Sequence, residues 1–371
     1  MSNRIICSKI LAVVCLLVAV CCPAGYAIDG KDVDFYFPSG AYVSKTKYNW
    51  TDFAAEVTAN CVTKEEKAEA IYRWLCDHIA YDTPLTIYTA DEAIEQGKGV
   101  CQAYSELFYR IGTAAGLDVE IVLGDVRDHT NKIMDIKHAW NVVNLGRHRK
   151  MLVDATWGAG ALIDGDFVKN EGEVRKMAWY DVDPKVMITS HYPSNNAYQY
   201  VRPTLSESAW QSCLYVHPLF VSLGFSPDDL YARSKAGTLE MPEISGKQGL
   251  ELVSIPPYGR LRTGEQYSFR VKNPGTDIVV LDGSDELDNW QPIGNDVYEL
   301  TFIPKSGEPV CLVESTNWLL VKTYDIYVRY QVDGGEITSS DDDSDSDSGG
   351  FWAAIANFFK QLIKSILALF S

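Results

Sequence analysis

The run of residues 63–155 constrains the fold more than any other part of the sequence. Two amphipathic helical patterns come first, and three strand-like runs follow them. The first helix is predicted to begin at the capping box Thr63–Glu66 and to end near Tyr81–Asp82. The second is predicted to span about Cys101–Ala115. Helices followed by strands that can pair with one another predict an α+β fold, with the helices packed on an antiparallel sheet.

The three strand-like runs span Val119–Val126, His138–Leu145 and Met151–Ala155. Turn-forming residues at Gly146–Arg149 separate the last two, so we expect these to pair as an antiparallel hairpin. Further along, between residues 241 and 335, short β-rich runs alternate with Gly, Pro, Asn and Asp turns. That spacing is typical of a small immunoglobulin-like β-sandwich.

The first 27 residues have the pattern of an export signal. Basic residues precede the apolar stretch Leu11–Val20, and Gly25–Ala27 offers small residues for cleavage after Ala27. The apolar stretch is short for a membrane span, which needs about 20 residues. We therefore expect a secreted protein, or one associated with the cell surface. A lipid on Cys21 or Cys22 is the less favoured alternative, because Val20 is large for that kind of processing.

Removal of this segment leaves five of the nine cysteines, namely Cys61, Cys76, Cys101, Cys213 and Cys311. Because five is odd, at least one thiol stays free unless it pairs with another chain. The cysteines therefore do not predict a disulfide framework, and they leave room for one reactive thiol.

Composition and charge exclude some classes of partner. The formal net charge of −17 repels phosphate backbones, so we expect no nucleic-acid partner. The histidines outside the strand-like runs show no paired ligand spacing, so we predict neither a metal nor another cofactor.

Cys101 is the candidate nucleophile. It lies where the second helix begins, directly after Gly97–Val100. A helix N-terminus presents unpaired amide donors and a partial positive charge, and both favour a thiolate. The same amides can hold an oxyanion when a carbonyl is attacked. Gly99 helps the chain to turn tightly and leaves the sulfur accessible.

A nucleophilic thiol needs a base and a group that orients the base. His138 is predicted on a strand, on the same face as Trp140. Asp154 is predicted on the partner strand, and cross-strand neighbours come within about 5 Å. Asp154 can then accept from one imidazole nitrogen while the other faces Cys101. Singly, each residue also has an ordinary structural explanation, so the prediction depends on their order and spacing together.

These residues lie in three segments, Gly99–Phe108, His138–Val143 and Val153–Gly160. The segments resemble the three catalytic segments of the transglutaminase-like superfamily, in that family's order and at its usual intervals. A further stretch, Trp179–Pro203, resembles the continuation in the kyphoscoliosis-peptidase-like branch, with Tyr198 where the branch usually has Trp. The resemblance runs from about residue 57 to residue 210.

The resemblance implies a papain-like arrangement with Cys101 as nucleophile, His138 as base and Asp154 as its orienter. It implies acyl chemistry on the amides of a protein or peptide: hydrolysis, glutamine deamidation or transfer to an amine. His191 is expected to support the fold near the site. Further site support is expected from Gly99, Gln102, Trp140 and Trp157.

The side chain of Gln102 should point away along the helix, so it is a poor donor to an oxyanion. A second, side-chain donor is not identified from the sequence.

Six parts are expected along the chain. They are a signal peptide (1–27), an N-terminal segment (28–56), a transglutaminase-like catalytic domain (57–240), an immunoglobulin-like β-sandwich (241–335), an acidic disordered linker (336–350) and an amphipathic C-terminal helix (351–371). For the helix Phe351–Ser371, binding to a membrane surface is favoured slightly over docking on protein, because an acidic tether precedes it.

Three functions stay open from the sequence. The favoured one is a secreted or surface-tethered cysteine enzyme, either a peptidase or a protein-glutamine acyltransferase. The second is a catalytically weak or inactive module that holds peptides in the same cleft. The third is an assembly protein that works through the β-sandwich and the terminal helix.

Overall fold

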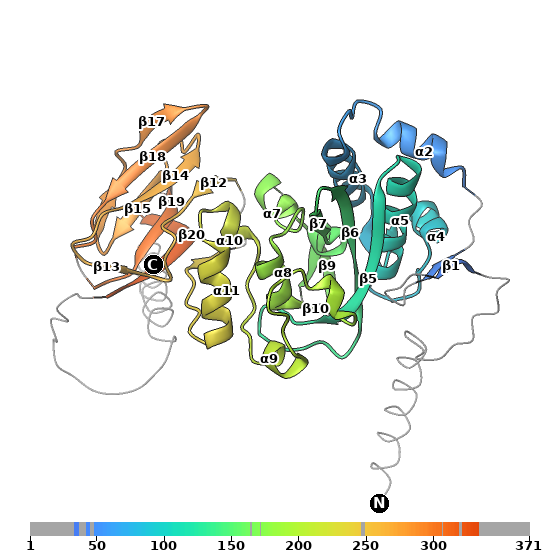
Figure 1. Cartoon of the computed structure of the whole chain (residues 1–371). Helices are drawn as coiled ribbons and strands as arrows, with labels where there is room; N and C mark the ends of the chain where they lie inside the picture. The colour runs from blue at the N-terminus through green and yellow to red at the C-terminus, as the bar shows by residue number, and fades with distance from the viewer. Residues whose placement is uncertain are drawn as a thin grey trace, which may run out of the picture. The chain divides into compact units, whose positions relative to one another are not determined.

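The structure is a computed structural model that describes residues 33–36, 42–44, 48–163, 165–170, 172–245, 249–305, 307–318 and 321–333 (Figure 1). The predicted signal peptide, acidic linker and C-terminal helix lie outside the described residues. Strands β1 (Val33–Tyr36) and β2 (Tyr42–Ser44) pair antiparallel ahead of helix α2 (Trp50–Val57). Within the described part, no helix is both long and apolar enough to cross a bilayer.

Helix α3 (Lys64–His78) begins at the predicted capping box. The Thr63 side chain accepts from the Glu66 amide, and the Glu66 carboxylate accepts from the Thr63 amide, which confirms the predicted start. The predicted end was wrong by about one turn. Ala80 and Tyr81 leave the helix as strand β3 and pair in parallel with β4 (Lys98–Gly99). Cross-strand pairing, which helical periodicity does not report, therefore decides where this helix stops.

The sheet of the core has the strand order β10–β5–β6–β7, and all its pairs are antiparallel. Its strands are β5 (Asp118–Val126), β6 (His138–Gly146), β7 (Arg149–Val153) and β10 (His191–Pro193). The predicted hairpin between β6 and β7 is confirmed. Arg147 and His148 form its turn with positive φ angles of 47° and 66°, as expected of a tight two-residue loop.

Helix α5 (Cys101–Ala114) packs on β5 and β6, and α4 (Ala90–Gln96) precedes it. Ala103, Leu107, Phe108 and Ile111 of α5 are fully buried, so the predicted apolar face is confirmed. Asn141 of β6 is buried and donates its side-chain amide to the Ser105 carbonyl of α5 at 3.0 Å. This polar contact fixes the position of β6 along the helix, three residues from His138.

Short elements follow the hairpin and lead to the second half of the chain. They are α6 (Ala155–Ala159), β8 (Gly160–Ile163), β9 (Asp166–Lys169), α7 (Glu173–Met177), α8 (Pro184–Ser190), the 3₁₀ turn η1 (Asn196–Tyr198), α9 (Glu207–Gln211), α10 (Leu219–Ser222) and α11 (Pro227–Ala236). Helix α8 leads directly into β10, so the chain returns to the edge of the core sheet about 40 residues after leaving it.

Two further sheets form a β-sandwich. One contains β11 (Glu243–Ile244), β20 (Val321–Asp333), β19 (Val310–Trp318), β15 (Ile278–Asp282) and β16 (Asp285–Leu287), with β13 (Arg260–Arg262) paired to β20. The other contains β12 (Glu251–Ser254), β14 (Tyr267–Lys272), β18 (Val297–Phe302) and β17 (Gln291–Gly294). Phe269 and Tyr330, one from each sheet, are buried with ring centroids 6.1 Å apart. The predicted fold class, an α+β core followed by a β-sandwich, is confirmed.

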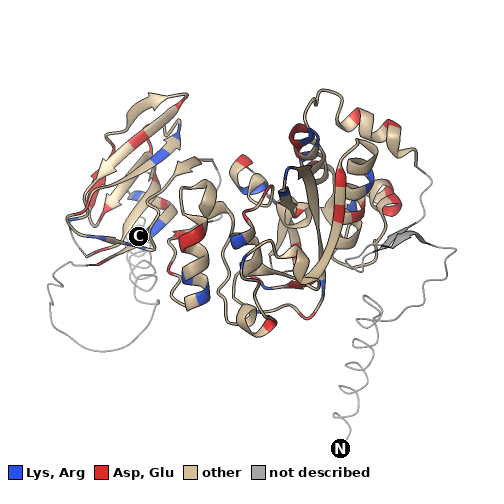
Figure 2. Cartoon of the chain, viewed as in Figure 1, with Lys and Arg blue, Asp and Glu red and all other residues tan. Residues whose placement is uncertain are grey.

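Charged side chains are mixed over the described elements. Figure 2 shows Lys and Arg scattered among Asp and Glu, without a long basic run on any one helix or strand in this view. The expectation of no nucleic-acid partner stays a prediction.

Gly124 of β5 offers a direct test of the packing of the core sheet. A Cβ at this position would lie 2.1 Å from the Tyr192 carbonyl oxygen and 2.6 Å from the Trp140 ring. Because backbone cannot move aside cheaply, we expect Gly124→Ala to destabilise the fold by about 2–3 kcal/mol. Urea unfolding measures this, with Gly116→Ala as a comparison in open space but at a positive φ. An unchanged midpoint in Gly124→Ala would contradict the pairing of β10 with β5.

Candidate active site

The backbone around residues 97–100 fixes the start of helix α5. Gly97 ends α4 with a left-handed φ of 65°, which glycine adopts without strain. The Val100 amide donates to the Ile87 carbonyl at 2.9 Å, and the Asp82 amide donates to the Gly99 carbonyl at 3.0 Å. Val100 provides no side-chain cap to α5. Cys101 is therefore the first residue of a helix whose N-terminus is not capped by a side chain, and it is half-buried.

Gly99 is required by packing rather than by a turn. A Cβ on this buried residue would lie 2.8 Å from the Ala103 Cβ and 3.2 Å from the Ala93 Cβ. Strand β4 can therefore lie against α4 and α5 only because residue 99 has no side chain. The predicted support from Gly99 thus takes the form of close backbone approach just before Cys101.

Asp82 fixes the loop that holds this segment. Its buried carboxylate accepts from the Thr86 amide at 2.6 Å, the Thr86 hydroxyl at 3.0 Å and the Ile87 amide at 3.0 Å. Lys98 lies 3.4 Å away as an ion-pair partner. A carboxylate bound by several donors orders its loop. Asp82 was not predicted as a site residue, because a single polar residue directly after a strand does not by itself indicate a functional site.

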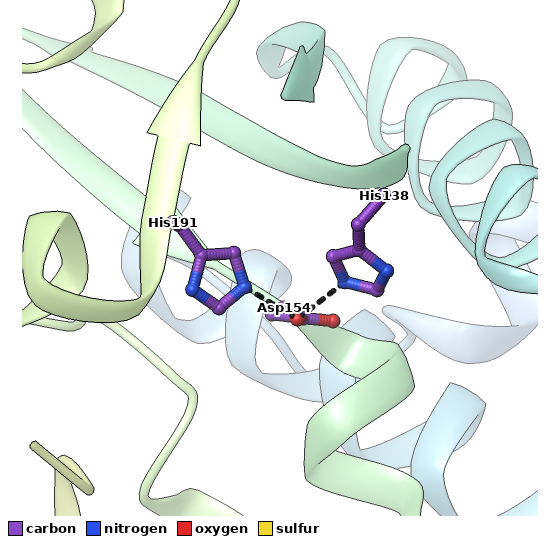
Figure 3. A group of neighbouring side chains, drawn as sticks. All are labelled: His138, Asp154 and His191. Atoms are coloured by element: carbon purple, nitrogen blue, oxygen red, sulfur yellow. Dashed lines mark hydrogen bonds and ion pairs between the residues drawn. The ribbon is translucent and has the colours of Figure 1, made fainter. Parts of the chain in front are cut away.

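His138 is the first residue of β6 and is 6% exposed. Its Nε2 lies 2.8 Å from Oδ2 of Asp154, and its second ring nitrogen points away from that carboxylate (Figure 3). Burial lowers the pKa of His138, but the charges of Asp154 and Cys101 and its hydrogen bonds to both raise it, to about 10. His138 is thus held as an imidazolium that contacts both other residues of the predicted triad.

Asp154 does not lie on a strand as predicted. Strand β7 ends at Val153, and Asp154 is the N-cap of helix α6. Its Oδ1 accepts from the amides of Thr156 and Trp157 at 2.9 and 3.1 Å, which is ordinary N-cap geometry. One carboxylate oxygen caps the helix, and the other is left for histidine.

Burial raises the pKa of Asp154, but the charge and hydrogen bond of His138, and then those of His191, lower it well below its usual range. The side chain is completely buried. Asp154 is therefore a buried, negatively charged carboxylate, and each of its two oxygens accepts two hydrogen bonds.

His191 is the third member of this group. It begins β10 and pairs with Val126 of β5. Its Nε2 lies 3.0 Å from Oδ2 of Asp154, and its Nδ1 lies 2.8 Å from the Ser190 hydroxyl. The resemblance placed His191 near the site, but nothing in the spacing of residues 154 and 191 predicted a direct contact.

Trp140 and Trp157 both lie beside the catalytic candidates. The centroid of the His138 ring is 6.3 Å from that of Trp140 and 5.5 Å from that of Trp157. The ring centroid of Trp179, which was not predicted as a site residue, lies 4.7 Å from that of Trp157. The rings of Trp140 and Trp157 thus lie beside the His138 ring. Gln102 is half-buried at the second position of α5, and its supporting role stays a prediction.

The nitrogen and oxygen atoms of His138, Asp154 and His191 lie within 4.8 Å of one another, so the group has the composition of a metal site. The geometry fits hydrogen bonds better. Both histidine nitrogens address the same carboxylate oxygen at 2.8 and 3.0 Å, the usual N–H···O distance. A zinc ion with bonds of about 2.0–2.2 Å would need these two contacts replaced. The expectation of no metal stays a prediction.

Comparison with known proteins agrees with this geometry. Residues 51–159 match the model of the transglutaminase-like superfamily. The chain is 28% identical to the kyphoscoliosis peptidase of Mus musculus over 224 residues, which cover 52% of this chain and 33% of the mouse protein. It is 26% identical to the kyphoscoliosis peptidase of Homo sapiens over 238 residues, which cover 56% of this chain and 35% of the human protein.

The match thus spans about a third of the length of these curated relatives. Among solved structures, a TGase covers 51% of this chain and 46% of its own chain, at 15% identity and a TM-score of 0.28. Residues 51–159 thus match the transglutaminase-like superfamily, and the chain is similar to proteins of its kyphoscoliosis-peptidase-like branch.

Proposed function

We propose that this chain is a cysteine enzyme that acts on the amide bonds of proteins or peptides. The observation that carries the proposal is the contact of a buried, charged His138 with both Asp154 and Cys101 at the start of α5. A half-buried thiol beside an imidazolium and an uncapped helix N-terminus has the features of an activated nucleophile.

The reaction follows from these positions. The Cys101 sulfur attacks the carbonyl carbon of the amide and forms a tetrahedral adduct, whose oxyanion faces the amides at the start of α5. His138 gives its proton to the leaving nitrogen, so an amine departs and a thioester with Cys101 remains. His138, now neutral, takes a proton from the next nucleophile, which attacks the thioester and regenerates the thiolate.

The second nucleophile decides the outcome. Water gives hydrolysis of a peptide bond, or deamidation if the amide is a glutamine side chain, whereas a primary amine gives cross-linking. The name of the two relatives, kyphoscoliosis peptidase, favours hydrolysis for this chain. We place hydrolysis first and keep acyl transfer as the alternative.

The proposal is tested by incubating the full chain with a panel of unfolded proteins and a fluorescent primary amine. Peptide cleavage, ammonia release and amine incorporation are scored together, which separates the three outcomes. Cys101→Ala should remove all three. Cys61→Ala is the matched control, because Cys61 is also a half-buried free thiol but contacts the Glu66 carbonyl.

Absence of every activity over a broad panel would contradict the enzyme proposal. If Cys101→Ala then bound the same proteins as tightly as the parent, the peptide-binding module would replace it.

We also propose that the protein is secreted or associated with the cell surface, on the support of its N-terminal export pattern. The apolar face of residues 351–371 supports binding to a membrane surface. Deleting these residues should then abolish co-sedimentation with anionic vesicles. Unchanged sedimentation would contradict the membrane role.

We propose that Tyr81 supplies the side-chain oxyanion donor that the sequence did not identify. It pairs with Gly99, two residues before Cys101, and its hydroxyl makes no hydrogen bond with any described residue. Burial raises the pKa of Tyr81, and the charge of Cys101 is the next largest cause. We expect Tyr81→Phe to lower kcat about 100- to 1,000-fold with KM little changed, as loss of one oxyanion donor does.

Steady-state kinetics with a substrate from the panel measure this, and Tyr88→Phe is a control because the Tyr88 hydroxyl donates to the Leu85 carbonyl. An unchanged kcat in Tyr81→Phe would leave the backbone amides of α5 as the donors.

A further inference from the structure

A second histidine holds Asp154, although the proposed chemistry needs only one. Oδ2 of Asp154 lies 2.8 Å from Nε2 of His138 and 3.0 Å from Nε2 of His191. Figure 3 shows the two rings reaching the same carboxylate from opposite sides. They come from different strands, since His138 begins β6 and His191 begins β10.

The neighbours of His191 determine where its proton lies. A carboxylate can only accept, so the Nε2–H of His191 donates to Asp154. The Ser190 hydroxyl lies 2.8 Å from Nδ1 and 3.3 Å from the Met187 carbonyl, so with a neutral ring it donates to the nearer acceptor, Nδ1. Both ring nitrogens are then satisfied with one proton on the ring. His191 is a neutral donor whose tautomer and ring orientation are fixed from two sides.

The surroundings of His191 also favour the neutral ring. The residue is 1% exposed, and its ring centroid lies 5.1 Å from that of Trp140, 4.5 Å from that of Trp157 and 5.3 Å from that of Trp179. Burial lowers the pKa of His191 to about 4, and the charge of His138 acts in the same direction against the pull of Asp154. The two histidines on one carboxylate are therefore driven to opposite charge states.

A neutral donor at this place has an advantage over a charged one. A lysine or arginine would also orient Asp154, but its charge would compensate the carboxylate and weaken the attraction between Asp154 and His138. A neutral N–H fixes the same oxygen and leaves the negative charge available to His138.

We propose that His191, oriented by Ser190, is a positioning residue that fixes the Asp154 carboxylate and thereby keeps His138 charged and Cys101 reactive. The inference deepens the proposed function, because it concerns the same site. Its test needs no substrate, so it does not fail together with the search for one.

Four variants of the full chain separate positioning from packing. His191→Phe keeps an aromatic ring among the three tryptophans but removes the donor. His191→Gln places an amide donor near the position of Nε2. Ser190→Ala removes the hydrogen bond to Nδ1 together with the longer contact between the Ser190 hydroxyl and the Met187 carbonyl at 3.3 Å. His217→Gln is the matched control, because His217 also lies against Trp179, at 5.4 Å between centroids, and its pKa is also lowered to about 4.

Two measurements are made on each variant. Histidine-ring NMR of ¹³C-labelled protein follows the titration of His138 directly. Iodoacetamide alkylation at pH 6, read by mass spectrometry of the Cys101 peptide, follows the reactivity of the thiol, with the Cys61 peptide as internal reference.

We expect His191→Phe to lower the titration midpoint of His138 by about one pH unit or more and to slow Cys101 alkylation about tenfold. Ser190→Ala should shift both in the same direction by less. His191→Gln should return both toward the parent values, and His217→Gln should leave both unchanged. A loss of packing alone would not be rescued by Gln, which does not reproduce an aromatic ring.

An unchanged His138 titration in folded His191→Phe overturns the proposal. If that variant does not fold, Ser190→Ala decides, since a shift supports the positioning role and no shift overturns it. If Cys101 of the parent reacts no faster than Cys61, the proposed enzyme function fails. The His138 titration still shows whether His191 acts on Asp154.

Discussion

Replacing Asp154 with asparagine is expected to lower turnover about 10³- to 10⁴-fold. The carboxamide oxygen can keep the N-cap contacts with Thr156 and Trp157, so its NH₂ group then faces Nε2 of His138. Two donors cannot pair, and His138 must accept at Nε2 and carry its proton on Nδ1. That tautomer turns an N–H toward Cys101 and cannot take the thiol proton. Single-turnover assays and Cys101 alkylation both measure the loss.

A matched variant distinguishes this effect from general loss of an acidic group. Asp125 is a partly exposed carboxylate that binds Lys137 at 2.6 Å, whereas Asp154 binds the two histidines. Asp125→Asn should keep turnover within about twofold of the parent, since exposed ion pairs contribute about 0–1 kcal/mol. Retention of more than a tenth of the activity in Asp154→Asn would show that Asp154 does not set the His138 tautomer.

Acid is expected to destabilise the protein before its carboxylates titrate. His191 has a pKa of about 4 in the folded chain, whereas an unfolded histidine titrates near 6.5. The unfolded state therefore binds the extra proton between these values, and stability falls as the pH drops from about 6.5 to 4. At about 1.4 kcal/mol per unit, the loss is about 3 kcal/mol. Urea unfolding at pH 7, 5.5 and 4.5 measures it.

His138 has the opposite sign. Its folded pKa is about 10, so its stabilisation is complete below about 6.5 and is lost as the pH rises toward 10. The chain should be most stable near pH 6.5–7. Its free energy of unfolding should fall at lower pH through His191 (the acid limb) and at higher pH through His138 (the alkaline limb). His191→Gln should flatten the acid limb and leave the alkaline one. His217→Gln should flatten the acid limb to a similar extent, because burial also lowers the pKa of His217 to about 4. An acid limb unchanged in His191→Gln would show that His191 is already protonated in the fold.

Sequence patterns within a few residues of one another predicted much of the core. The capping box at Thr63 started α3, the run from Cys101 gave α5 with its apolar face, and the turn at Arg147–His148 joined β6 to β7. Each is encoded by residues within a few positions of one another. Caps, helical spacing and strand alternation act over that range and can be recognised without knowledge of the fold.

The arrangement of the site was harder to predict from the sequence. Sequence order placed Cys101, His138 and Asp154 on neighbouring elements, but it put Asp154 on a strand. The Asp154 side chain is short and its own helix amides compete for it, so the chain turns into α6 at this point. An aspartate followed by Ala-Thr-Trp could have been recognised as an N-cap, and this was the signal that the prediction missed.

The sequence by itself determined the fold class, the start of the Cys101 helix, the hairpin carrying His138 and the resemblance to the transglutaminase-like superfamily. Only the tertiary structure decided that His191 shares the Asp154 carboxylate, that Gly99 is needed for close packing, and that Tyr81 lies beside the nucleophile's helix. The Asp154–His191 hydrogen bond joins residues 37 positions apart, the Tyr81–Gly99 strand pair joins residues 18 positions apart, and Gly99 fits its backbone between two helices. No local pattern encodes such distances, because they are set by how the packed elements bury their side chains together.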